Sequence, residues 1–169
     1  MKRTLLGLSL YAMAMSAAHA GTAEVTWGDV DEFHDVRAAA DERPGYQERL
    51  VNELTAHFQE LATTLPEGYT WKVKVTDLDL AGRLDFAEVG SRTKQVRTVD
   101  DIEYPRINFK SELTDASGNV VEQRSVELKD MRFLDGVSRA SRAQNERLYF
   151  EKKMIRDWFH SGEGPKKSS

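Results

Sequence analysis

The sequence predicts an α+β domain, in which an antiparallel or mixed sheet of about four strands has two helices packed on one face. Three observations support this fold class. Apolar residues recur at helical spacing over 45–65, they alternate with polar residues around 71–80 and over 102–128, and a second helical stretch closes the chain. Strand, helix, strand, hairpin and helix therefore follow one another, an order typical of helices gathered on one face of a sheet.

The N-terminal part of the domain predicts a strand followed by a helix. Residues 24–27 alternate as a short strand, and residues 28–44 are acidic and irregular, with Phe33 and Val36 as expected anchors. The helix is expected from Gly45 to Leu65, where Pro66 ends it. Its apolar stripe consists of Leu50, Leu54, Phe58, Leu61 and Leu65.

The middle of the chain predicts a strand with an irregularity. Trp71, Val73 and Val75 alternate with polar residues, but the next apolar residues are Leu78 and Leu80, so the phase changes. Either a bulge lies near residues 76–77, or two aspartates continue on the inner face. The bulge is favoured, because burial of two unpaired carboxylates is costly. Residues 83–100 are mostly polar and are interpreted as a long surface loop.

The C-terminal part predicts a hairpin and a helix. Strands over 102–113 and 120–128 flank a turn at 115–119, and Pro105 marks a strand start or an edge. Ser141 and Gln144 fit a capping box for a helix that ends near Phe159. Its expected inward residues are Leu148, Ile155, Trp158 and Phe159. The single domain is expected over 21–160, with a disordered tail at 161–169.

Residues 1–20 have the pattern of a cleavable signal peptide. Lys2 and Arg3 precede an apolar stretch from Leu5 to Ala18, and residues 18–20 (Ala-His-Ala) form an A-x-A cleavage site. The apolar run is shorter than the roughly 20 residues that a spanning anchor needs. The chain also lacks the cysteine that a lipid anchor requires. Export to the periplasm, with cleavage after Ala20, is therefore expected, and no membrane-spanning segment is expected in the remainder.

Composition limits the class of function. Loss of the two N-terminal positive charges changes the formal charge from −4 to −6, which disfavours general nucleic-acid binding. The absence of cysteine excludes disulfides and thiolate metal sites. No glycine-rich phosphate loop, G-x-S-x-G or H-E-x-x-H motif occurs, so no cofactor is expected.

Four blocks of sequence together resemble a known family. They are 65–68 (Leu-Pro-Glu-Gly), 75–82 (Val-Thr-Asp-Leu-Asp-Leu-Ala-Gly), 104–107 (Tyr-Pro-Arg-Ile) and 149–159 (Tyr-Phe-Glu-Lys-Lys-Met-Ile-Arg-Asp-Trp-Phe). The family that they resemble consists of exported proteobacterial proteins and is called domain of unknown function 3016. The resemblance covers about residues 25–159 and implies one domain per chain, with no assigned activity and no functional residues to transfer.

Asp77 and Asp79 form the best candidate for a metal site. Carboxylates two residues apart on a strand point to the same side, and Ca²⁺ or Mg²⁺ prefers oxygen ligands. The competing interpretation is structural: the aspartates accept backbone N–H groups or pair with Arg83 or Arg106. The structural interpretation is favoured, because ion pairs within a fold imitate functional sites.

Two basic clusters are candidates for binding an anionic ligand or partner. The first lies in the predicted loop and comprises Arg92, Lys94 and Arg97. The second lies on the outer face of the last helix and comprises Arg139, Arg142, Lys153 and Arg156. Contact with anionic lipid headgroups or an acidic partner is one interpretation of these clusters, and an ordinary solvated surface is the other.

The sequence therefore favours a non-catalytic periplasmic domain that binds a ligand or an envelope partner. A metal-assisted hydrolase using Asp77 and Asp79 is the alternative hypothesis. A purely structural envelope protein is the third.

Overall fold

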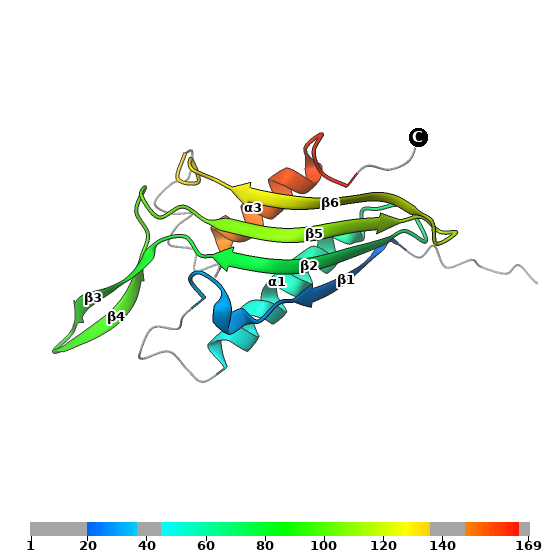
Figure 1. Ribbon diagram of the computed structural model, residues 1–169. Helices are drawn as coiled ribbons and strands as arrows, with labels where there is room; N and C mark the ends of the chain where they lie inside the picture. Colours follow the sequence, from blue (N-terminus) through cyan, green and yellow to red (C-terminus); the bar gives the residue numbers. More distant parts are fainter. Residues whose placement is uncertain (1–19, 37–44, 136–147, 166–169) are drawn as a thin grey trace, which may run out of the picture.

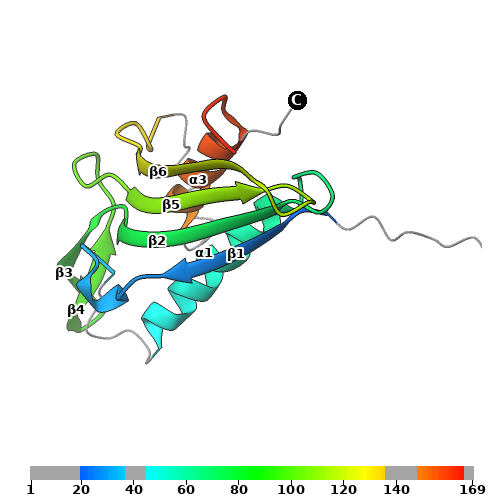
Figure 2. The ribbon, with the colours of Figure 1, turned by 45° about the vertical axis from the view of Figure 1, so that its right-hand side comes forward.

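A computed structural model describes residues 20–36, 45–135 and 148–165, and within them the predicted α+β class is confirmed (Figure 1). Two helices, α1 (Tyr46–Ala62) and α3 (Tyr149–His160), lie against one face of a four-stranded sheet, as both ribbon views show (Figure 2). None of the helices in the described ranges is long and apolar enough to cross a bilayer. The opposite face of the sheet carries no described helix.

The sheet has the order β1-β2-β5-β6 and is mixed. Its strands are β1 (Thr22–Trp27), β2 (Thr70–Asp79), β5 (Arg106–Thr114) and β6 (Val120–Lys129). β1 runs parallel to β2, because α1 carries the chain back between them, whereas β2-β5 and β5-β6 are antiparallel. The predicted hairpin over 102–128 is confirmed as β5-β6, and Pro105 directly precedes the first of these strands.

The core lies between the sheet and the helices. The predicted stripe of α1 is buried throughout, and the inward residues of β2 are at most 1 % exposed. Trp71 lies at the centre, with ring contacts to Phe58 and Trp158, one from each helix. The predicted inward residues of α3 are also buried.

The buried indole of Trp71 gives a prediction for stability. Its Nε1–H donates to Ser111 Oγ over 2.9 Å inside the core. Ser111→Ala leaves this donor without a partner, and we expect the free energy of unfolding to fall by about 1–2 kcal/mol. Urea denaturation measures the loss. Ser125→Ala, on the solvent side of β6, is the matched control and should leave the midpoint unchanged.

The predicted bulge in β2 is confirmed. The β2-β5 register shifts between Val75 and Asp77, so that Leu78 is buried and both aspartates are half-buried. A short 3₁₀ helix, Val30–Glu32, follows β1 and leads into an isolated bridge between Asp35 and Asp79. Phe33 and Val36 are buried, as predicted.

The prediction of a surface loop over 83–100 is wrong. This segment forms a second, two-stranded sheet of β3 (Arg83–Val89) and β4 (Arg92–Thr98), which projects from the body of the domain (Figure 1). Gly90, at φ 66°, supplies the positive φ that the tight turn requires. The alternation of apolar and polar residues was absent because neither face of this hairpin is buried against the core.

The last helix is not continuous over its whole predicted range. α3 begins at Tyr149, and Leu148 before it has the left-handed φ of 61°, which interrupts a continuous helix. The capping-box residues Ser141 and Gln144 lie outside the described residues. Of the predicted tail, Gly164 is buried and its N–H donates to the carbonyl of Ser161, whereas 166–169 lie outside the described ranges.

Candidate functional site

Strand pairing arranges the side chains on the open face of the sheet in rows. The first, which we name the mixed row, consists of Glu24, Lys72, Glu112 and Gln123. The next, which we name the lysine row, consists of Thr26, Lys74, Lys110 and Ser125. A polar open face is usual for a sheet that is covered on one side only. The two rows differ, however, in how their charges are paired.

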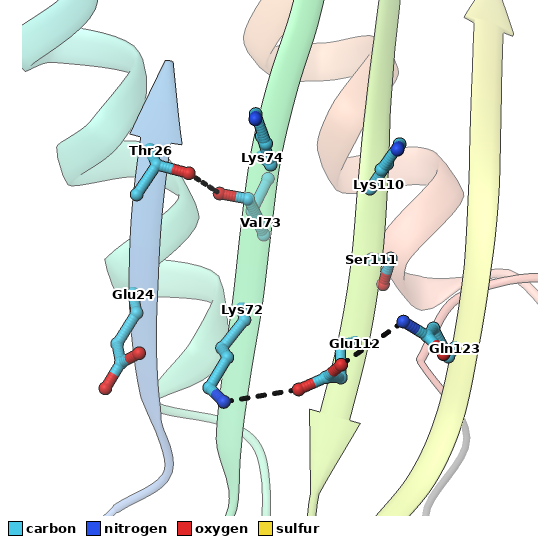
Figure 3. Close-up of a pocket in the computed structure, with 9 residues that line it drawn as sticks. All are labelled: Glu24, Thr26, Lys72, Val73, Lys74, Lys110, Ser111, Glu112 and Gln123. Carbon is cyan, nitrogen blue, oxygen red and sulfur yellow. Dashed lines mark hydrogen bonds and ion pairs between the residues drawn. The ribbon is translucent and has the colours of Figure 1, made fainter. Parts of the chain in front are cut away.

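The mixed row contains an internal ion pair. The Lys72 ammonium lies 3.2 Å from Glu112 Oε1, and the Gln123 amide donates to the other carboxylate oxygen of Glu112 over 3.3 Å (Figure 3). Glu24 lies opposite Lys72 in the register but forms no hydrogen bond or ion pair with any described residue. One acid of this row is thus left unpaired.

The lysine row carries two positive charges and no acid. Lys74 and Lys110 are direct cross-strand partners, which places their β-carbons about 5 Å apart. Neither ammonium has a partner among the described residues, and Figure 3 shows both without a contact. Like charges directly opposite one another destabilise a sheet. Repulsion between the two ammonium groups is therefore expected to destabilise the β2-β5 pairing at this position.

A hollow of about 260 Å³ lies over the two rows. Its wall includes both unpaired lysines, Glu24, the Lys72–Glu112 pair and Gln123. Ser111 also borders it, but the Ser111 hydroxyl already accepts the indole hydrogen bond of Trp71. The hollow thus contains two ammonium groups that have no partner in the part of the chain that the structure describes.

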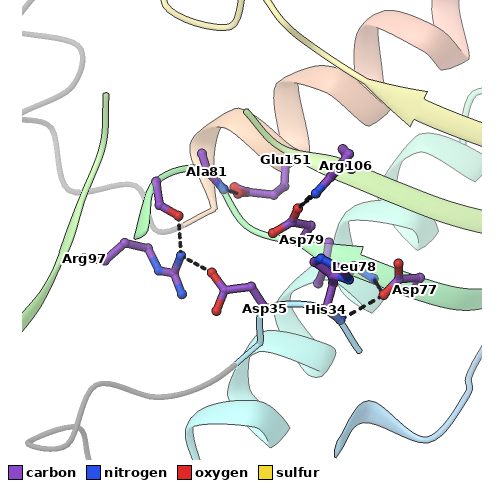
Figure 4. A network of polar contacts seen from close by, with 10 residues as sticks. His34, Asp35, Asp77, Leu78, Asp79, Ala81, Arg97, Arg106 and Glu151 are labelled. Carbon is purple, nitrogen blue, oxygen red and sulfur yellow. Dashed lines mark hydrogen bonds and ion pairs between the residues drawn. The ribbon is translucent and has the colours of Figure 1, made fainter. Parts of the chain in front are cut away.

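Asp77 and Asp79, the predicted metal ligands, have protein partners. Asp77 Oδ1 accepts the backbone N–H groups of His34 and Leu78 over 3.0 and 2.9 Å (Figure 4). Asp79 pairs with the Arg106 guanidinium. These contacts match the structural interpretation of the two aspartates. Among the described residues, no three acidic or histidine side chains form a cluster suited to a metal ion.

A partly buried polar cluster attaches the β3-β4 hairpin to the body. Arg97 donates through Nη1 to Asp35 over 2.7 Å and to the carbonyl of Gly82 over 2.8 Å. The Glu151 carboxyl, at the start of α3, is 3 % exposed and accepts the N–H of Ala81 over 2.8 Å. Burial raises the pKa of Glu151 above its usual range. The cluster joins four separate segments and holds the base of the hairpin (Figure 4).

The predicted loop cluster is divided between the two faces of β4, and only two members of the predicted helix cluster lie within the described residues. Arg92 and Lys94 share one face of β4, whereas Arg97 lies on the other face and is bound at the base. Lys153 pairs with Asp157 over 2.6 Å, which raises the Lys153 pKa. Arg156 borders a groove of about 540 Å³ between α1 and α3. Arg139 and Arg142 lie outside the described residues.

The residues of the hollow were not predicted as a site. Lys72 and Lys74 alternate with buried residues, which indicates that both lysines face solvent. This alternation does not indicate which side chains of the adjacent strands lie beside them. Lys110 becomes the partner of Lys74 only through the β2-β5 register, which is uniform from Thr70 to Val75. The signal available in the sequence was one lysine at an outward position of each strand: Lys74 has no acid at the adjacent outward positions, whereas Lys110 has Glu112 at one of them.

Fold and surface together define a class: a small α+β domain with helices on one face of a mixed sheet and an open, charged face on the other. The chain belongs to the family described as Protein of unknown function (DUF3016), whose model matches residues 21–161. The resemblance inferred from the sequence blocks is thereby confirmed. No curated protein and no solved structure matches the chain significantly.

Proposed function

We propose that the protein is a non-catalytic binding domain of the bacterial cell envelope, and that it takes an anionic ligand between Lys74 and Lys110. The observation that carries this proposal is the unpaired lysine row inside the hollow. A phosphate or carboxylate placed between the two ammonium groups replaces a repulsion with two attractions. Such charge-assisted contacts are stronger than neutral hydrogen bonds.

Binding without catalysis fits the groups that surround the hollow. The lysines are donors, the Glu112 carboxylate is held by Lys72 and Gln123, and the Ser111 hydroxyl is held from the core side. A nucleophile needs an adjacent base, and none of these groups offers that arrangement. The groups are suited to recognition.

Location in the envelope rests on the signal-peptide pattern of residues 1–20. Two observations support it: the family match begins at Gly21, directly after the predicted cleavage site, and Gly21 already belongs to the fold. Gly21 is buried, and its N–H donates to the carbonyl of Leu65 over 3.3 Å. A cut after Ala20 would thus leave the described domain intact.

Anion binding is tested by thermal unfolding of the purified protein with inorganic phosphate, against chloride at matched ionic strength. Phosphate should raise the Tm in a saturable manner, because a ligand that binds only the native state stabilises it. The double variant Lys74→Gln/Lys110→Gln should lose this shift, while Arg92→Gln on the hairpin should retain it. An equal shift in both variants would overturn the proposal.

Removal of one lysine should weaken phosphate binding but should make the ligand-free protein more stable. Lys110→Gln abolishes the cross-strand repulsion, so we expect the unfolding free energy without ligand to rise by about 0.2–1 kcal/mol. Chemical denaturation at low ionic strength measures this change. A variant that is more stable yet no longer responds to phosphate separates loss of binding from loss of folding. Destabilisation by this substitution would show that Lys110 serves the fold.

Export is tested by expression of the full chain in a Gram-negative host, followed by cell fractionation and mass measurement. The proposal expects periplasmic protein that starts at Gly21. Ala20→Leu places a large side chain at the cleavage site and should cause precursor to accumulate. Unprocessed wild-type protein in the cytoplasm would contradict this part of the proposal.

A further inference from the structure

Glu24 adds a second requirement to the ligand proposed above. It borders the hollow from β1, is exposed, and has no hydrogen bond or ion pair with any described residue. Its neighbour in the register, Lys72, directs its ammonium to Glu112 on the other side (Figure 3). The unpaired charges of the hollow are therefore one carboxylate and two ammonium groups.

These charges occupy separate parts of the hollow. Glu24 lies opposite Lys72, so Lys74 is one strand across and two residues further along. With strands about 4.8 Å apart and a rise of about 3.3 Å per residue, the Cα atoms of Glu24 and Lys74 are about 8 Å apart. Lys110, one strand further across, lies opposite Lys74. The hollow is negative at the β1 edge of the mixed row and positive across the lysine row.

We infer that the ligand is zwitterionic, with a primary ammonium that binds Glu24 and a phosphate or carboxylate that binds Lys74 and Lys110. This inference rests on the proposed function and adds the group that a simple anion lacks. A ligand that carries both an ammonium and an anion can pair with Glu24 and with both lysines at once. A simple anion leaves Glu24 unpaired beside it.

Two sources supply this chemistry, an aminophosphate and the two termini of a short peptide. O-phosphoethanolamine and triglycine represent them, and N-acetylation of each probe removes the ammonium while the anion remains. Isothermal titration calorimetry at low ionic strength should give two- to fivefold weaker binding for each acetylated probe, about the effect of one solvent-exposed ion pair. The probe with the higher affinity identifies the anion that the lysines prefer.

Glu24→Gln tests the assigned partner. This variant should bind the free and acetylated probes equally, with the affinity of the wild-type protein for the acetylated form. Glu127→Gln, on the same face but outside the hollow, should keep the preference for the free amine. Retention of the preference in Glu24→Gln would overturn the assignment.

The outcomes separate the two proposals. Equal affinity of the wild-type protein for free and acetylated probes would overturn the zwitterion inference while anion binding stands. Binding of neither probe nor of inorganic phosphate would overturn the proposed function itself, and the inference with it.

Discussion

Arg97→Met should destabilise the protein by about 2–3 kcal/mol and release the β3-β4 hairpin from the body. Methionine keeps an unbranched apolar stem but lacks the guanidinium, so the bonds to Asp35 and the Gly82 carbonyl are lost. Removal of one member of a buried ion pair costs about 3–5 kcal/mol, and the value is lower here because the Arg97 side chain is 20 % exposed. An isolated two-stranded hairpin is marginally stable in water.

Urea denaturation measures the global effect, and hydrogen exchange measures the local one. Amides of β3 and β4 should exchange faster in Arg97→Met than those of β5. Arg92→Met is the matched control, since Arg92 is exposed at the far end of the same strand. Protection of the hairpin that is unchanged in Arg97→Met would show that other contacts hold it.

Glu151→Gln should make the protein more stable at neutral and alkaline pH. Burial raises the folded-state pKa of Glu151. Below the unfolded-state pKa both states are protonated, and the contribution of this group to stability is fully present. As the pH rises toward the folded-state pKa, the unfolded state releases its proton first, so that stability falls. Glutamine accepts the Ala81 N–H as the carboxyl does, but it does not titrate.

The comparison is made by denaturation of both proteins from pH 4 to pH 8. Their unfolding free energies should be similar at pH 4 and diverge above it, by about 1.4 kcal/mol for each unit of pKa displacement. Burial lowers the pKa of His57, but that effect is common to both proteins and cancels in the difference. Glu127→Gln, at an exposed position of β6, should follow the wild-type curve. If the unfolding free energies of Glu151→Gln and wild type instead ran parallel from pH 4 to pH 8, Glu151 would be ionised in the folded protein, with its charge stabilised by its neighbours.

The layered fold could be predicted because side chains that face the core are apolar and recur with the period of a helix or a strand. The apolar stripe of α1 and the phase change at Leu78 both indicate which side chains face the core. The buried stripe and the bulge that they predict are confirmed. The β3-β4 hairpin could not be predicted in this way, since it projects from the core and its strands alternate weakly. The start of α3 depends on the left-handed backbone of Leu148, which apolar spacing does not indicate, and the capping-box residues lie outside the described residues.

The candidate site was less predictable than the fold because it depends on register. Arg92, Lys94 and Arg97 are close in sequence, yet strand alternation and the contact with Asp35 separate them. Lys74 and Lys110 are far apart in sequence, and a one-residue change in the β2-β5 pairing would move one of them to the other face. Such charge pairs become visible only when the pairing of the strands is known.

The central claim is that an anion binds between Lys74 and Lys110 on the open face of the sheet. Titration of isotope-labelled protein with inorganic phosphate, followed by the amide and lysine side-chain resonances, tests this claim most directly. The account predicts saturable shifts at residues 73–75 and 109–111, with little change on the hairpin or along the groove between the helices. Shifts centred on Arg92 or Arg156, or no saturable shift, would contradict it.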